Sequence, residues 1–341
     1  MKSVNTLKAL AVALATAIGA SSCVHQYPEE ITEDYELVFT VLQDTQWLPD
    51  YDLFLTREGE GSLAIRYDFR VYPKGNTTYP VKEFTIVKED LTRADYTTTV
   101  MLPEGEFDIY CWSDYCTLAD GAPIYYDDSN FGAITYIKPY EGDTELRDAF
   151  RGVTTVKVEA PDYFEPVPSE GTITLSRPVA RYRIYSIDLE DFIDHEVTRG
   201  KLMPPSEVAA GANAARYARL QDYVVKVIYP LYMPAVFDNF SNNPIDSWTG
   251  ISFTGSMVQA SQEEALLAFD YVYVNGEESG VQVMIEVYDP DGILIARSST
   301  MTIPTKRNRT TNVYGKFLTT LRSDGVGINP DFDGEYNIEL P

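Results

Sequence analysis

Apolar and polar residues alternate with a period of two along much of the chain after residue 35. The run at 63–71 shows this most clearly, because Arg66, Asp68 and Arg70 fall between its apolar residues. Every second side chain of a strand lies on one face, so each such run predicts a strand with one buried face. The strands predicted in the first half are 35–41, 63–71, 84–87, 97–101, 107–112, 134–138, 154–159 and 172–176.

Ser176-Arg177-Pro178 interrupts the alternation, which starts again at 180–187. The later predicted strands are 223–229, 266–274, 281–288, 293–299, 312–318 and the tail 336–340. Turns such as Asp289-Pro290-Asp291-Gly292 favour hairpins. The Ala-rich segment 206–222 predicts one clear helix, and 143–150 a second, shorter one. Short strands separated by Gly/Pro turns are typical of sandwiches. The chain is therefore predicted to be all-β, with β-sandwich domains at 35–177 and 178–341 and one short helix in the second.

The first residues have the pattern of an export signal. A basic start with Lys2 and Lys8 precedes the uncharged, mostly apolar run 9–20. Such a run is too short to span a bilayer, which needs about 20 residues, and predicts a signal peptide at 1–22. Ala20-Ser21-Ser22-Cys23 resembles the lipobox of bacterial lipoproteins, which implies lipidation of Cys23 after cleavage. An ordinary cleavage site with an incidental cysteine is the alternative. Residues 23–34 are polar and acidic, and are expected to form a flexible leash.

The formal net charge of −25 becomes −27 when the signal peptide is removed. So acidic a protein is not expected to bind nucleic acid or anionic lipid. With Cys23 lipidated, Cys111 and Cys116 remain. An extended strand would separate them by about 16 Å and direct them to opposite faces, so two free buried thiols are favoured over a disulfide, which would need a tight turn between them.

The sequence lacks the residues of common catalytic and metal sites. It has two histidines, His25 and His195, and no nucleophile elbow, metalloprotease, P-loop or dinucleotide-binding motif. Acidic clusters such as 125–128 and 263–264 could serve glycoside hydrolysis, but chance pairs are expected among 52 acidic residues. Segment 329–334 resembles the opening of a calcium loop, but Leu340 stands where a glutamate is needed. We expect no enzymatic activity, cofactor or metal.

Two segments carry a family resemblance. Ser176-Arg177-Pro178-Val179-Ala180-Arg181-Tyr182 and the segment 306–319, which begins Lys306-Arg307-Asn308-Arg309-Thr310, resemble the fimbrillin-like lipoproteins of the Bacteroidetes. That group includes structural, anchor and accessory subunits of type V pili. Trp112-Ser113-Asp114-Tyr115 is also similar to this group, and the resemblance covers most of residues 35 to 320.

The resemblance implies two transthyretin-like sandwiches on a lipoprotein exported to the outer surface. In shaft subunits of the group, cleavage after an arginine removes the first strand, and a neighbour's C-terminal strand fills the groove. The matching positions here are Arg57, in the loop after the first predicted strand, and the tail strand with Tyr336, Ile338 and Leu340. Arg57 as an ordinary loop charge, and the tail as an edge strand of its own domain, are the alternatives.

These patterns together predict a non-enzymatic, lipid-anchored outer-membrane protein exposed at the cell surface. It would be a fimbrial subunit, or an anchor or accessory protein, that assembles with other fimbrial subunits by β-strand addition. The alternative is a lipid-anchored binding module for a glycan or a host protein, with tyrosines such as Tyr125 and Tyr126 as contacts. Packing of these two tyrosines inside their own loop is the competing interpretation.

Overall fold

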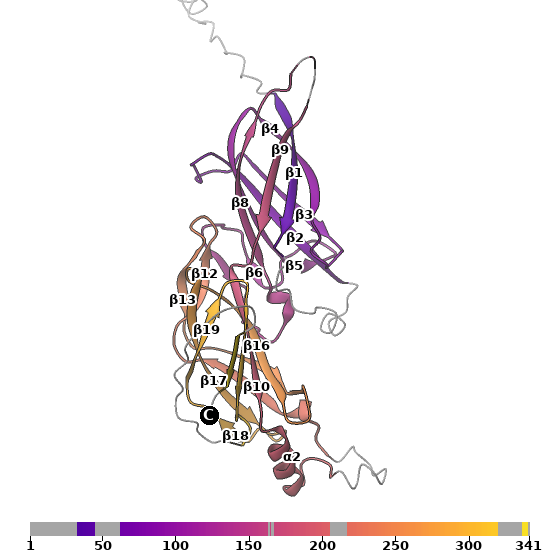
Figure 1. The fold of residues 1–341 in the computed structure, drawn as a ribbon, viewed down its shortest axis with the longest axis vertical. Coiled ribbons are helices and arrows are strands. Elements are labelled where there is room, and N and C mark those ends of the chain that lie inside the picture. Colours follow the sequence, from indigo (N-terminus) through magenta and orange to yellow (C-terminus); the bar gives the residue numbers. More distant parts are fainter. Residues whose placement is uncertain are drawn as a thin grey trace, which may run out of the picture.

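The computed structural model describes residues 33–44, 62–162, 164, 167–204 and 217–319, and the backbone of 336–339. Within these residues the chain consists mainly of β-strands in several sheets, with one α-helix (Figure 1). The predicted all-β class with a single short helix in the second half is confirmed.

The first unit packs two sheets face to face. One sheet has the order β4-β1-β9, and the other β3-β2-β5-β8. All neighbouring strands are antiparallel except β1 and β9, which are parallel. The strands are β1 (Asp34–Gln43), β2 (Leu63–Pro73), β3 (Lys82–Lys88), β4 (Tyr96–Pro103), β5 (Gly105–Thr117), β8 (Phe150–Val158) and β9 (Ser169–Leu175). The inward residues of both sheets form one apolar core, as the alternation predicts.

The second unit contains three sheets, with the orders β15-β16-β10-β20-β21, β14-β11-β17-β18 and β13-β12-β7-β6; β19 also pairs with β17. Its strands from the second half of the chain are β10 (Val179–Ser186), β11 (Val224–Tyr229), β12 (Met233–Asp238), β13 (Asn243–Trp248), β14 (Ile251–Ser256), β15 (Val258–Gln259), β16 (Ala265–Tyr273), β17 (Glu278–Tyr288), β18 (Leu294–Arg297), β19 (Met301–Lys306), β20 (Thr310–Gly315) and β21 (Tyr336–Glu339). The two units lie end to end (Figure 1).

Two strands of the second unit come from the connection between β5 and β8. They are β6 (Tyr126–Asp127) and β7 (Ile134–Tyr136), and β7 pairs with β12, placing Thr135 opposite Val236. Their buried side chains belong to the core of the second unit, as does Trp112 from β5. The domains 35–177 and 178–341 stay a prediction, and this connection is the part of 35–177 that lies with the second unit.

The α-helix that the structure describes lies in a stretch for which the sequence predicts no element. The α-helix α2 (Leu189–Thr198) buries Leu189, Phe192 and Glu196. The predicted helix at 206–222 falls largely outside the described residues, and its end forms only the short 3-10 helix η6 (Leu220–Asp222). The predicted helix at 143–150 is wrong: it is reduced to the 3-10 turn η4 (Glu145–Arg147), because β8 begins at residue 150.

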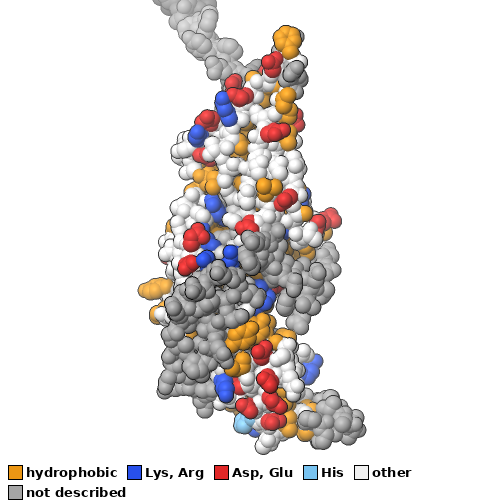
Figure 2. All heavy atoms as spheres, viewed as in Figure 1, with side chains coloured by type: hydrophobic (Ala, Val, Ile, Leu, Met, Phe, Trp, Pro, Cys, Tyr) orange, Lys and Arg blue, Asp and Glu red, His pale blue; other side chains and the backbone are white. Residues whose placement is uncertain are grey.

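The face of the molecule in Figure 2 shows acidic side chains scattered over both units. No helix among the residues that the structure describes is both long and apolar enough to cross a membrane.

Candidate assembly site at the N-terminal strand

Strand β1 lies between β4 and β9, so both of its edges are hydrogen-bonded. Its inward side chains, Leu37, Phe39 and Val41, are 0% exposed. The strand therefore supplies both backbone pairing and core side chains to the first unit. Neighbouring strands lie about 4.8 Å apart, so its removal would leave a gap of about 10 Å between β4 and β9. Such a gap has unpaired backbone groups on both sides and an apolar floor.

Phe39 occupies the middle of this strand. Its ring packs against the ring of Phe69, which belongs to the opposite sheet. The two rings are arranged edge to face, with centroids 6.0 Å apart. Gly171 of β9 is its register partner, and a Cβ atom there would come within 3.0 Å of the Phe39 ring and 2.8 Å of Val156 Cγ1. The absent side chain at Gly171 thus makes the space that the ring of Phe39 fills.

The end of β1 is held by two consecutive residues. The backbone N–H of Gln43 donates to Asp95 Oδ1 at 2.7 Å, and its side-chain amide donates to the Tyr67 hydroxyl at 3.1 Å. The N–H of Asp44 donates to the carbonyl of Leu175 at 2.8 Å, which extends the pairing with β9 by one residue. These contacts fix the strand immediately before the segment 45–61.

The carboxylate of Asp44 also makes a hydrogen bond to the second unit. Asn308 Nδ2 donates to Asp44 Oδ2 at 3.0 Å, and Asn308 Oδ1 accepts from Arg177 Nη1 at 2.8 Å. Arg177 in turn holds the carboxylate of Asp148 through two hydrogen bonds of 2.7 and 2.8 Å. We call these four residues the waist link, because they lie where the two units meet. Arg177 and Asn308 come from the two segments that carry the family resemblance.

A second polar cluster fixes the β5–β8 connection to the second unit. Arg147, 1% exposed, lies 4.0 Å from the centroid of the Tyr140 ring and 3.6 Å from Asp270 Oδ1. The hydroxyls of Tyr140 and Tyr229 donate to Asp270 Oδ2 at 2.5 and 2.6 Å. Burial raises the pKa of Asp270, whereas the nearby guanidinium and the hydroxyl donors work in the opposite direction. The cluster is a buried ion pair surrounded by hydrogen bonds.

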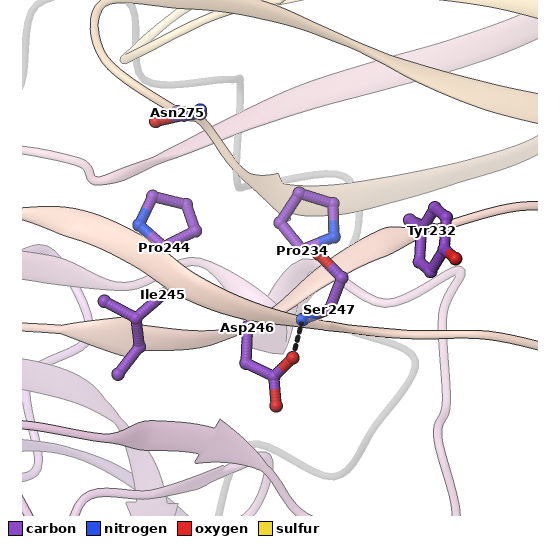
Figure 3. Close-up of a pocket in the computed structure, with 7 residues that line it drawn as sticks. All are labelled: Tyr232, Pro234, Pro244, Ile245, Asp246, Ser247 and Asn275. Carbon is purple, nitrogen blue, oxygen red and sulfur yellow. Dashed lines mark hydrogen bonds between the residues drawn. The ribbon is translucent and has the colours of Figure 1, made fainter.

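A hollow of about 380 Å³ lies on the β12–β13 hairpin of the second unit, and Figure 3 shows the residues that line it. In Figure 1 this hairpin lies away from β1. Tyr232 and Ile245 at this hollow are 73% and 56% exposed. Asp246 accepts a hydrogen bond from the backbone N–H of Ser247 at 2.7 Å. The lining combines an aromatic ring, two prolines and polar groups; its members are Tyr232, Pro234, Pro244, Ile245, Asp246, Ser247 and Asn275.

A family model described as a family of unknown function, DUF6562, matches residues 42–341. The chain belongs to this family. No curated protein sequence matches it.

Solved structures similar to this DUF6562 chain include fimbrial and adhesin proteins of the Bacteroidetes. The fimbrial anchor protein Mfa2 from Porphyromonas gingivalis is 10% identical, with a TM-score of 0.37 and coverage of 77% of this chain and 81% of that one. A fimbrial assembly protein from Parabacteroides distasonis is 11% identical, with a TM-score of 0.40 and coverage of 82% and 90%. A candidate polysaccharide-binding protein from Bacteroides thetaiotaomicron is 12% identical, with a TM-score of 0.43 and coverage of 79% of both chains. Likenesses of this size do not bear on function.

Three of the residues predicted from the sequence, Cys23, Arg57 and Leu340, lie outside the described residues. Tyr336 and Ile338 belong to β21, whose backbone pairs in parallel with β20 at the edge of its sheet. This DUF6562 chain thus places its tail strand beside its own β20, and donation of that strand to another copy stays a prediction.

Three other candidates from the sequence are buried structural side chains, and a fourth is exposed. Cys111 and Cys116 are free and buried, as favoured above. Tyr126 is fully buried, and its hydroxyl donates to the Arg147 carbonyl at 2.5 Å. It therefore packs, as favoured, but in the core of the second unit and not within its own loop. His195 is a largely exposed side chain on α2 beside Glu196.

Sequence reasoning missed the waist link. Arg177 and Asn308 stand in the two segments singled out for the resemblance, so their positions were visible. Their contact spans 131 positions and depends on a turn at which Asn308 has a φ of +56°. An asparagine after two basic residues is the only local sign of such a turn, since asparagine tolerates positive φ better than most residues.

Proposed function

We propose that this chain is a non-enzymatic, lipid-anchored protein of the outer membrane, exposed at the cell surface, that takes part in a fimbrial assembly by β-strand addition. The observation that carries the proposal is the central place of β1 between β4 and β9. The predicted processing residue, Arg57, falls in the segment between β1 and β2. One cut there would disconnect this strand from the rest of the chain, whereas an uncut chain keeps it and remains attached through Cys23.

In this proposal the groove left by β1 receives a strand from another subunit. Backbone hydrogen bonds to β4 and β9 would supply affinity, and the sites vacated by Leu37, Phe39 and Val41 would select the register. The tail positions Tyr336, Ile338 and Leu340 have the same spacing of two residues. The tail is therefore the proposed donor. Other fimbrial subunits are the proposed partners.

Two measurements test this function. The first is the N-terminal residue of the surface-exposed protein: a lipid-modified Cys23 supports an anchor or accessory subunit, and a start at Glu58 supports a processed shaft subunit. A start at neither residue overturns the proposal. The second is treatment of the purified protein with a trypsin-like protease, followed by a search for ladders of multimers. Arg57→Ala should abolish them, whereas the matched exposed-loop control Arg219→Ala should not.

The hollow on the β12–β13 hairpin favours a second candidate function, a surface module that binds a glycan. An exposed tyrosine ring can stack on the apolar face of a sugar, and Asp246 and Asn275 at the same hollow offer hydrogen-bonding groups. A glycan array tests this function. Tyr232→Ala should abolish binding, while Tyr79→Ala, which changes a tyrosine 79% exposed in the β2–β3 hairpin, should leave it unchanged. If the unmodified protein binds no glycan on the array, the glycan-binding function is overturned.

A further inference from the structure

Asp44, the residue directly after β1, makes a long-range contact. Asp44 Oδ2 accepts a hydrogen bond from Asn308 Nδ2, and the two residues are 264 positions apart. Asp44 follows the final residue of β1, and Asn308 lies in the turn between β19 and β20. The end of the first unit's central strand is thus tied directly to the second unit.

Both the oxygen and the nitrogen of the Asn308 side-chain amide are hydrogen-bonded. Its oxygen accepts from Arg177, and its nitrogen donates to Asp44. The backbone N–H of Asn308 donates to the carbonyl of Val179, the first residue of β10, at 3.1 Å. Arg177 also donates to both carboxylate oxygens of Asp148, so its guanidinium has a fixed position. This guanidinium in turn fixes the orientation of the Asn308 amide that donates to Asp44.

We propose that Asn308 acts as a latch on β1, through which the second unit controls how readily this strand leaves the first. The inference rests on the proposed function, in which β1 is removed after processing. Strands separate from sheets by opening from their ends, and the latch acts at the end nearest the predicted cut. An intact latch keeps β1 in place. Its loss lowers the free energy needed to open the strand.

The test uses the uncut, full-length protein and measures amide hydrogen exchange of a peptide that covers residues 36–44. Asp44→Ala removes the acceptor, and Asn308→Gly removes the amide while keeping a residue suited to positive φ. Each variant should raise exchange from local opening of β1 by roughly tenfold, the size expected for one hydrogen bond to a charged group. Asn242→Gly is the matched control, because Asn242 also has a positive φ, +58°, in the second unit.

A double variant separates a latch from a general loss of stability. If the two residues act through their mutual contact, Asp44→Ala combined with Asn308→Gly should exchange no faster than the faster single variant. Asn308→Asp, which sets two carboxylates against each other, should exceed both single variants. Unchanged exchange in either single variant, or additive effects in the double variant, overturns the proposal. Exchange in β16 and β17 reports whether Asn308→Gly has loosened the whole second unit. If it has, the result for Asp44→Ala decides.

Because no cleavage or multimer enters this measurement, its outcome is separate from that of the proposed function. Protection of β1 can depend on Asn308 in a chain that never assembles. Conversely, if multimers form equally fast with Asn308 and with Asn308→Gly, assembly by strand addition is supported and the latch is overturned.

Discussion

The ring of Phe39 lies over Gly171, its register partner on β9, at a position where a Cβ atom would come within 3.0 Å of it. The glycine is needed because the ring of the central strand fills the volume of a missing side chain. Since Phe39 is fully buried, its ring has no solvent-facing space into which to move.

Gly171→Val should therefore destabilise the first unit. Overpacking of a filled core costs about 1–3 kcal/mol. Gly132→Ala is a suitable control, because the closest atom to a Cβ there, Asn130 Oδ1, lies at 3.4 Å. Denaturant unfolding should show a lower midpoint for Gly171→Val and little change for the control. Equal stability of both variants would mean that β1 shifts freely along its sheet.

The buried pair of Arg147 and Asp270 should be sensitive to removal of one charge. Asp270→Ala leaves the Arg147 guanidinium buried without its carboxylate, and such a loss costs about 3–5 kcal/mol. Tyr140→Phe removes one hydrogen bond to the same carboxylate and should cost about 1 kcal/mol. Chemical denaturation of the two variants gives both values. Similar losses in the two would show that the ion pair does not dominate this cluster.

Asp143 should make stability depend on pH. Burial raises its pKa to about 7, and its carboxylate accepts from the N–H groups of Ser256 and Phe269 at 3.3 and 3.2 Å. The folded chain then binds this proton more tightly than the unfolded chain. Its contribution to stability is therefore fully present below about pH 4 and is lost as the pH rises towards 7.

Asp143→Asn removes this titration. Between pH 4 and 7 the unmodified protein should lose up to about 1.4 kcal/mol of unfolding free energy per pH unit relative to the variant. Asparagine suits the positive φ of +59° at this position, so backbone strain should not obscure the comparison. Parallel stability curves of the two proteins across this range would contradict the prediction.

Residues 178–341 expressed alone should not fold into a packed domain. They lack β6, β7 and the segment that carries Arg147, which together cover aromatic residues of the second core such as Phe237 and Tyr273. We expect exposed apolar surface, detected by dye binding, and no cooperative unfolding transition. The full chain, which keeps the connection and both cores, is the control and should show a sharp transition.

The two buried cysteines should resist thiol reagents in the folded protein. Burial raises the pKa of Cys116 to about 11 and that of Cys111 well above its usual value, so little reactive thiolate is present near neutral pH. Labelling should require a denaturant and should then modify both thiols. Rapid labelling without denaturant would indicate local opening of β5.

Period-two alternation predicted most strands, including β1 and β2, because their inward side chains enter one core on a single face. It did not foresee α2: its buried residues Leu189, Phe192 and Glu196 include a charged side chain, and Glu196 is tolerated inside because Tyr223 and Arg199 hydrogen-bond to it. The placement of β6 and β7 in the second unit was also invisible. Pairing across 100 residues depends on shape complementarity that no local pattern encodes.

The connection that carries β6 and β7 makes the chain pass between the two units three times: out after β5, back into β8, and out again from β9 to β10. In the proposed filament, shear would pull each subunit along its length. In this chain such a force would be shared among three chain segments that connect the units, instead of one linker. Bending or twisting between the units would have to deform all three connecting segments together. The units should then respond to tension as a single stiff rod.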